Sequence, residues 1–284
     1  MIDAAMGALH ERKVDCHCHV LDPQKHPYKE GVRYRPAGGE IGTADQFHAV
    51  CDAYRVVHAL LVGPNSGYGE DNRCLLDVIA RGDGRFKGIA VVPNDASTAD
   101  LVTLKAQGIV GIALNATFHG VDYYLDVRPL IRRAADLDLF FQIQVERDQL
   151  LGLAPVLADC PARILVDHCG RPDIAGGLSQ PAFAMLCELG RSGRAVIKLS
   201  GLAKFSAGSF PYEDTWPYVQ ALVDAFGIDR CLWGSDWPFL RAPERLDYGP
   251  LLSIVDRLFP DPQDRSKLLW ETPTRLFGFR AVST

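Results

Sequence analysis

Short apolar segments of strand-forming residues recur along the chain, and each is bounded by Gly, Pro or Asp. Segments with helical periodicity lie between them, for example NRCLLDVIARG and WPYVQALVDAFG. This alternation, at spacings of roughly 20 to 45 residues, is typical of βαβ units and a parallel sheet. The strands are almost continuously hydrophobic, which indicates that both faces of the sheet are covered. The eight predicted strands span residues 13–20, 56–63, 86–92, 109–115, 139–146, 163–169, 195–201 and 230–236.

Eight such strands in 284 residues favour a closed (β/α)8 barrel, a fold that commonly needs about 250 residues. An open doubly wound sheet is disfavoured because no GxGxxG follows the first strand and no GxxxxGK[ST] occurs. No Ser/Gly-rich linker divides the chain, so we expect a single α/β domain over residues 1–284. The residues after about 262 are predicted to form one extra helix that closes the outer ring.

Composition narrows the choice of partners. The chain is 48% hydrophobic and 23% charged, which are globular values, and its net charge of −5 comes with scattered Lys and Arg. Neither a nucleic acid nor a membrane surface is therefore expected as a partner, whereas a homo-oligomer stays open. The N-terminal MIDAAMGALHERK lacks the pattern of a signal peptide. The 8 cysteines are too sparse for a disulfide scaffold, and we expect a cytoplasmic protein with reduced thiols.

The first candidate catalytic residues occur in the first predicted strand, VDCHCHV. Side chains alternate along a strand, so Asp15, His17 and His19 are predicted to share one face, with Cys16 and Cys18 on the other. A single buried histidine is more often a satisfied core residue. Two at the carboxyl end of one buried strand are harder to explain that way, because each needs hydrogen-bond partners.

Two later strands end in residues of the same kind. His168 ends the sixth strand, and Asp236 ends the eighth, where Pro238 argues for a long loop rather than a helix cap. In a barrel these ends meet at the active face. Such a set suits hydrolysis: the carboxylate takes a proton from water while the imidazoles polarise a carbonyl or bind a metal that does so. No GxSxG is present, and packing is the better interpretation of Cys18 and Cys169.

Further polar side chains lie on the fifth and seventh strands. Gln142, Gln144 and Glu146 share one face, as do Lys198 and Ser200. We expect Gln144 and Ser200 at the barrel mouth, where a polar side chain is not buried without partners. We expect Lys198 deeper in the barrel, paired with a carboxylate such as Asp15.

Four segments, VDCHCHV, NSGYGEDN, VDHCGRPD and WGSDWP, resemble the amidohydrolase superfamily, within it the branch of pyrone-dicarboxylate, sugar-lactone and muconolactone hydrolases. The resemblance runs from about residue 13 to the C-terminal LFGF. It implies a (β/α)8 barrel that hydrolyses a lactone ring, with Asp236 activating water and His17, His19 and His168 stabilising the carbonyl oxygen. By the same resemblance and by position at the mouth, the substrate-binding residues are expected to be Tyr34, Tyr68, Asn72, Asn115, Gln144, Ser200 and Lys204.

Two departures from the family pattern matter. Metal-dependent members carry Lys or Glu at the end of strand 4 and His at the end of strand 5, where this chain has GIALN and QIQVE. Two expectations therefore stand: no cofactor, or one divalent ion, zinc first, on His17, His19 and Asp236. Ala113 also replaces an arginine that binds a carboxylate in the pyrone-dicarboxylate branch. Other mouth-loop residues offer replacement charge, although each taken alone is more often a solvated side chain: Arg33, Arg35, His119, Arg171 and Lys204.

Three enzyme functions remain possible at this point. The first is a hydrolase of an acidic or polyhydroxylated lactone. The second is a metal-dependent decarboxylase on the same barrel, which the missing strand-5 histidine disfavours. The third is a lactone isomerase, which has no need of a water-activating carboxylate such as Asp236. A binding barrel without catalysis is the weakest alternative, because it gives no reason to place three histidines and one aspartate at one rim.

Overall fold

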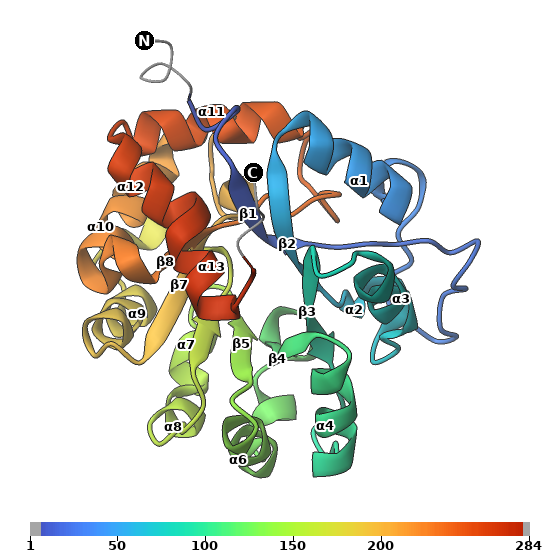
Figure 1. The fold of residues 1–284 in the computed structure, drawn as a ribbon. Coiled ribbons are helices and arrows are strands. Elements are labelled where there is room, and N and C mark those ends of the chain that lie inside the picture. The colour runs from blue at the N-terminus through green and yellow to red at the C-terminus, as the bar shows by residue number, and fades with distance from the viewer. Residues whose placement is uncertain (1–6, 281–284) are drawn as a thin grey trace.

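The computed structural model describes residues 7–280, and the strands form one parallel sheet in the order β1 to β8 (Figure 1). Residues 1–6, on which the signal-peptide expectation partly rests, lie outside the described residues. Each predicted strand coincides with an observed one, and most observed strands end a few residues earlier. The strands are Lys13–Cys18 (β1), Val56–Val62 (β2), Phe86–Val91 (β3), Ile109–Asn115 (β4), Phe140–Gln144 (β5), Ile164–Val166 (β6), Ala195–Leu199 (β7) and Cys231–Trp233 (β8).

Backbone hydrogen bonds between the ends of β1 and β8 close the barrel. Cys18 pairs with Trp237 in an isolated parallel bridge. The His19 amide donates to the Trp237 carbonyl at 2.7 Å, and the Asp236 amide donates to the His17 carbonyl at 2.7 Å. The predicted (β/α)8 barrel is confirmed. Its closure joins the segment that carries His17 and His19 to the segment that carries Asp236.

Helices surround the strands (Figure 1). Two of them begin at capping boxes, in which Thr43 with Gln46 and Ser97 with Asp100 satisfy the free amides of the first turn. Among residues 7–280, no helix has both the length and the apolar character needed to cross a membrane. The longer helices are Ala44–Ala53 (α1), Arg73–Arg81 (α3), Thr98–Ala106 (α4), Arg128–Asp136 (α6), Pro181–Arg191 (α9), Trp216–Phe226 (α10) and Tyr248–Leu258 (α11). The short ones are Asn65–Tyr68 (α2), Ala116–His119 (α5), Gln149–Gly152 (α7), Ala154–Leu157 (α8), Pro262–Ser266 (α12) and Thr272–Phe277 (α13).

The part of the barrel interior away from the polar strand ends, here called the lower interior, is apolar. It is separate from the hydrophobic core between the strands and the helices. Side chains such as Leu60, Phe140 and Leu165 fill it from different strands. The predicted C-terminal helix is present as α12, a π-helical turn over Lys267–Glu271, and α13. This helical segment packs against β1 and β8, and its Trp270 and Phe277 join the interior cluster. The extra helix therefore seals the end of the barrel away from the polar strand ends.

A bulge in β1 overturns part of the predicted alternation. Asp15 pairs with Ala59 and Cys18 with Leu61, so β1 uses one residue more than β2 between these pairs. Cys16 consequently belongs to the interior cluster. Asp15 instead accepts hydrogen bonds from the Ser235 hydroxyl and, at 2.9 Å, from the Tyr248 hydroxyl of α11. The prediction that Asp15 shares a face with His17 and His19 and pairs with Lys198 was wrong.

The sealing role of the C-terminal helix predicts a stability effect. Phe277 is 3% exposed, and replacing it with alanine leaves a cavity that partial relaxation does not fill. Phe277→Ala should lower the free energy of unfolding by about 3–5 kcal/mol in urea denaturation. Phe210→Ala makes the same chemical change at a 45% exposed position and should cost far less. Equal losses for the two variants would contradict the sealing role.

Candidate active site

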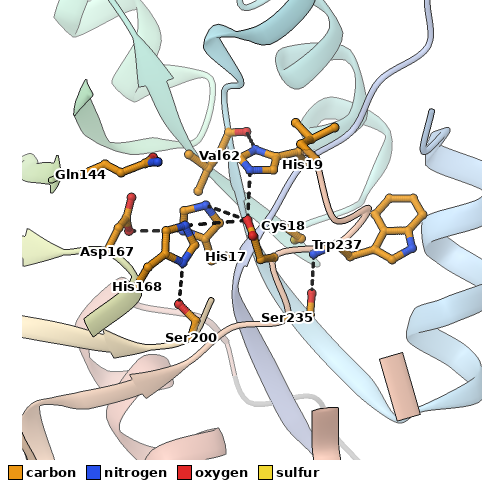
Figure 2. Close-up of polar contacts among 12 residues, drawn as sticks. His17, Cys18, His19, Val62, Gln144, Asp167, His168, Ser200, Ser235 and Trp237 are labelled. Carbon is orange, nitrogen blue, oxygen red and sulfur yellow. Dashed lines mark hydrogen bonds and ion pairs between the residues drawn. The ribbon is translucent and has the colours of Figure 1, made fainter. Parts of the chain in front are cut away.

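Three imidazoles surround one buried carboxylate at the polar end of the barrel (Figure 2). The Nε2 atoms of His17, His19 and His168 lie 3.7, 3.6 and 3.7 Å from Asp236 Oδ1. Lys204 forms an ion pair with Asp236 Oδ2 at 2.8 Å. Among the described residues, neither buried oxygen of Asp236 accepts a hydrogen bond of good geometry. This unused acceptor capacity, faced by three ring nitrogens, marks a place where a water, substrate atom or metal ion fits.

The rear of each ring has a partner that fixes its orientation. His19 Nδ1 lies 2.7 Å from the Val62 carbonyl oxygen, and His168 Nδ1 lies 3.0 Å from the Ser200 hydroxyl (Figure 2). His17 Nδ1 lies 3.2 Å from Asp167 Oδ1. Ser200 was predicted to bind substrate, but its hydroxyl is buried behind His168. The three rings are thus held with their Nε2 edges toward Asp236.

The backbone carrying these side chains has an uncommon conformation. His168 has φ +51° and Asp236 has φ +63°, both in the left-handed region that ordinary residues avoid. Such conformations persist where the surrounding structure enforces them, and they cluster at functional sites. Gly201 and Gly234 leave the necessary room: a Cβ at these positions would lie 2.7 Å from His168 Nδ1 and from His17 Cβ, respectively.

Beneath His17 lies a fully buried ionic group. Lys198 Nζ is 3.0 Å from Asp167 Oδ1 and 2.6 Å from Gln142 Oε1. Gln142 Nε2 in turn donates to Asp167 Oδ2 at 2.8 Å. Lys198 does lie deeper than the mouth residues, as predicted, but its carboxylate is Asp167. A buried pair of this kind needs nearly every polar atom satisfied, and here the two side chains and Gln142 satisfy one another.

Burial and neighbouring charge set the protonation of the site. Burial lowers the pKa of His17 to about 4, although Asp167 opposes this, and it holds the pKa of His168 well below its usual value. For Asp236, burial acts to raise the pKa, but Lys204 and His168 outweigh it and the pKa lies well below the ordinary range. At neutral pH the site therefore holds neutral His17 and His168 beside the ionised carboxylate of Asp236.

The same residues form a group suited to a divalent ion. Ligand atoms of His17, His168 and Asp236 all lie within 4.8 Å of one another. Imidazole nitrogen and carboxylate oxygen are ligand atoms that zinc accepts. The predicted metal set had His19 in place of His168, and His19 lies at the same distance from Asp236 but outside this group. The residues present fit a metal ion.

A cavity of about 440 Å³ opens above Asp236, and six of the predicted site residues line it. They are His19, Asn115, Gln144, His168, Lys204 and Asp236. His17 lies directly beneath, against Asp236. The cavity is large enough for a small cyclic ester with polar substituents.

Besides Ser200, three residues expected to bind substrate do not line this cavity. Tyr34 hydrogen-bonds Glu40 and lies near Arg241. Tyr68 is buried, and its hydroxyl accepts a hydrogen bond from the Asp22 amide. Asn72 bonds both the amide and the carbonyl of Val91, so it anchors the end of β3.

The cavity has two chemically different walls. Neutral amides and hydroxyls line most of the side built from β2, β4 and β5, and the carboxylate of Glu146 lies just beyond β5. Sequence reasoning missed Asn65 and Thr117 there: Asn115 Nδ2 donates to Asn65 Oδ1 at 3.0 Å. The cations that line it, Arg171, Lys204 and Arg241, come from the loops after β6, β7 and β8. Arg241 lies in the irregular loop after β8, and no sequence pattern pointed to it as a cavity residue.

The remaining mouth-loop charges lie elsewhere. Arg33 donates to the Phe118 carbonyl at 2.7 Å, His119 contacts Asn65, and Arg35 is exposed. Arg171 differs from these, because its buried Nε has no hydrogen-bond partner among the described residues. Burial lowers the pKa of Arg171, and the nearby carboxylate of Asp236 opposes that shift. Arg171 is therefore the cation with the most capacity for an anionic ligand.

The cysteine thiols are structural. All eight are buried and free, and burial raises the pKa of Cys169 to about 12 and that of Cys18 well above its usual value. Protonated, buried thiols are poor nucleophiles, in agreement with the packing role predicted for both.

Comparison with known proteins finds an amidohydrolase family model and several relatives named as lactone hydrolases. A model of the amidohydrolase family matches residues 14–279. The 4-sulfomuconolactone hydrolase of Rhizobium radiobacter is 32% identical over 271 residues, covering 93% of this chain and 89% of that protein. The L-fucono-1,5-lactonase of Burkholderia ambifaria is 33% identical over 220 residues, covering 69% and 72%. A crystal structure of a "probable 2-pyrone-4,6-dicarboxylic acid hydrolase" from Acinetobacter baumannii, with citric acid bound, has a TM-score of 0.82 at 28% identity and covers 95% of this chain and 100% of that one.

Proposed function

The chain belongs to the amidohydrolase family, and we propose that it hydrolyses the ester bond of an anionic lactone. One observation carries this proposal: three imidazole edges converge on the buried carboxylate of Asp236 at the floor of a cavity that three cations line. The similar proteins are named as hydrolases of lactones, which supports the same reaction class here.

In the first step, water attacks the lactone carbonyl carbon. The new C–O bond forms as the carbonyl π electrons move onto oxygen, and Asp236 takes the proton from the water. The Nε2 edges of the histidines face the same space, so a ring N–H there stabilises the negative oxygen of the tetrahedral intermediate. Because His17 and His168 are neutral, such an N–H donates without first losing a proton to Asp236.

In the second step, the intermediate collapses. The ring C–O bond breaks, the carbonyl re-forms, and the proton on Asp236 returns to the departing ring oxygen. The product is an open-chain carboxylic acid with a new hydroxyl group, and the acid then releases its proton to solvent at neutral pH. The Lys204 ammonium, 2.8 Å from Asp236 Oδ2, keeps this carboxylate ionised before the reaction.

A divalent ion, when bound, would be held by His17, His168 and Asp236 and would polarise the carbonyl or acidify water. The remaining groups act independently of it. Asn115 and Gln144 offer amide donors and acceptors to the neutral part of the substrate, and Arg171 and Arg241 offer charge to its anionic part. This division suits a lactone with an acid substituent on one side of the ring.

The first prediction concerns the base. Asp236→Asn keeps the shape of the side chain but removes its capacity to accept a proton, so kcat should fall by about 10²–10⁴. Turnover of muconate, pyrone and sugar lactones in a pH-indicator assay, with thermal unfolding on the same samples, measures this. Asp229→Asn alters an exposed carboxylate away from the cavity and serves as the control. Activity of Asp236→Asn within a few-fold of the parent would remove this residue from the mechanism.

A second prediction concerns the position of His168. Gly201→Ala places a methyl group 2.7 Å from His168 Nδ1 at a residue with φ +64°. We expect a loss of stability of about 1 kcal/mol from the left-handed backbone and, because the ring is displaced, a fall in kcat of at least ten-fold. Gly278→Ala has the same φ of +64° and a left-handed backbone, and the nearest atom to its Cβ is Lys87 Nζ at 3.6 Å, so it should lose stability alone. Equal kcat values for both variants would show that the ring position is unimportant.

A third prediction separates charge recognition from catalysis. A charge-assisted contact contributes about 1.5–3 kcal/mol, so Arg171→Gln should lower kcat/KM for an anionic lactone by about ten- to a hundred-fold. The same variant should act almost normally on the methyl ester of that lactone. Arg35→Ala tests the exposed alternative and should have no effect. If Arg171→Gln treats acid and ester alike, a neutral sugar lactone held by the amide wall becomes the better assignment.

A further inference from the structure

Lys198 contacts three polar side chains, one through an ion pair and two at hydrogen-bond distance, and these contacts bear on the tautomer of His17. Lys198 is 0% exposed, and as an ammonium it carries three N–H donors. Three acceptors lie within reach of Nζ among the described residues: Gln142 Oε1 at 2.6 Å, Asp167 Oδ1 at 3.0 Å and His17 Nδ1 at 3.1 Å. Each donor therefore has one acceptor, provided that His17 Nδ1 is a lone pair.

The alternative arrangement leaves donors in conflict. If His17 carried its proton on Nδ1 and donated to Asp167, that N–H would face a Lys198 N–H across 3.1 Å. The third Lys198 donor would then be buried without an acceptor, which costs roughly 1–3 kcal/mol. Asp167 has other partners, since Lys198 forms an ion pair with Oδ1 and Gln142 donates to Oδ2. The lone pair on His17 Nδ1 and Asp167 Oδ1 lie 3.2 Å apart, and the Lys198 ammonium contacts both of these acceptors. The network thus assigns the single proton of neutral His17 to Nε2, which faces Asp236 Oδ1.

His19 is held in the opposite way. Its Nδ1 lies 2.7 Å from the Val62 carbonyl oxygen, which can only accept, so the ring proton sits on Nδ1. His19 Nε2 is then a lone pair, 3.6 Å from the carboxylate oxygen of Asp236. Two acceptors that face each other at this distance require a donor between them, and a water molecule supplies two.

We propose that Lys198 is a positioning residue that holds His17 as an N–H donor toward the cavity, so that His17 stabilises the lactone oxygen while His19 and Asp236 together hold the attacking water. This assignment rests on the proposed lactone hydrolysis and divides the imidazoles into a donor and an acceptor. The same hydrogen bond opposes a metal ion, because a ring nitrogen that carries a proton has no lone pair to donate. Binding zinc through His17 Nε2 requires His17 to move its proton to Nδ1, against the Lys198 donor.

The tautomers themselves are the direct test. Long-range ¹H–¹⁵N spectra of protein labelled in its 8 histidines distinguish an Nε2–H ring from an Nδ1–H ring. We expect His17 as Nε2–H and His19 as Nδ1–H in the parent protein. Lys198→Met removes the donors and should convert His17 to Nδ1–H, with His19 unchanged. His17 found as Nδ1–H in the parent would overturn the proposal.

Zinc affinity gives a second readout that needs no substrate. Zinc titrated into chelator-treated Lys198→Met should bind about ten-fold or more tightly than in the parent, while metal-free lactone turnover should fall by a similar factor. Lys204→Met also removes a cation beside Asp236 but breaks no hydrogen bond to an imidazole. It therefore controls for charge alone and should leave the His17 tautomer unchanged. Equal zinc affinities for the parent and Lys198→Met would also overturn the proposal.

Lys198→Met leaves Asp167 without its cation, so the double variant Asp167→Asn/Lys198→Met accompanies it. The double variant buries no unpaired charge, and the asparagine amide oxygen can accept from His17 Nδ1, so the same change of tautomer is expected. A parent protein that hydrolyses none of the lactones would contradict the proposed function. The tautomer and zinc results would still decide the role of Lys198.

Discussion

Everything at the active end depends on the two backbone hydrogen bonds that join the ends of β1 and β8. The Asp236 amide donates to the carbonyl of His17, and the His19 amide donates to that of Trp237. These bonds bring the imidazoles of the first strand to the carboxylate of the last. They also dictate that closure occurs through irregular backbone, because Asp236 is left-handed and β8 itself ends at Trp233.

The apolar lower interior makes this irregularity tolerable. Left-handed residues such as His168 and Asp236 cost of order 1–3 kcal/mol each, and the bare carboxylate adds a further cost of burial. Below them, side chains from the strands and from the C-terminal helix form a buried hydrophobic cluster. Lys198 and Asp167 mark the boundary between the two layers, because they stand on strands whose preceding inward residues, Val196 and Leu165, are apolar.

Prediction from sequence succeeded where a regular pattern decides the structure. Strand hydrophobicity gave all eight strands, and position at a strand end gave His17, His19, His168 and Asp236. It failed for Asp15, because a bulge adds one residue and a period of two cannot reveal where alternation breaks. Loop residues are harder still, because no period constrains their direction. Tyr68 and Asn72, which bond nearby backbone instead of facing the cavity, show that proximity to a strand end along the chain does not fix where a loop side chain points.

The pairing of opposite histidine tautomers explains why similar sets of residues can serve different chemistry. Three imidazoles and one carboxylate form a metal site only when each Nε2 offers a lone pair, and hydrogen bonds on the far side of the ring decide that. The Val62 carbonyl accepts the proton of His19 Nδ1 and leaves a lone pair on Nε2. The Lys198 ammonium donates to His17 Nδ1, so the ring proton of His17 is on Nε2. The cofactor preference of this barrel is therefore encoded one layer below the residues that face the substrate. A comparison of the ligand residues alone cannot reveal it, because His17 and His19 are identical in type and nearly identical in distance from Asp236.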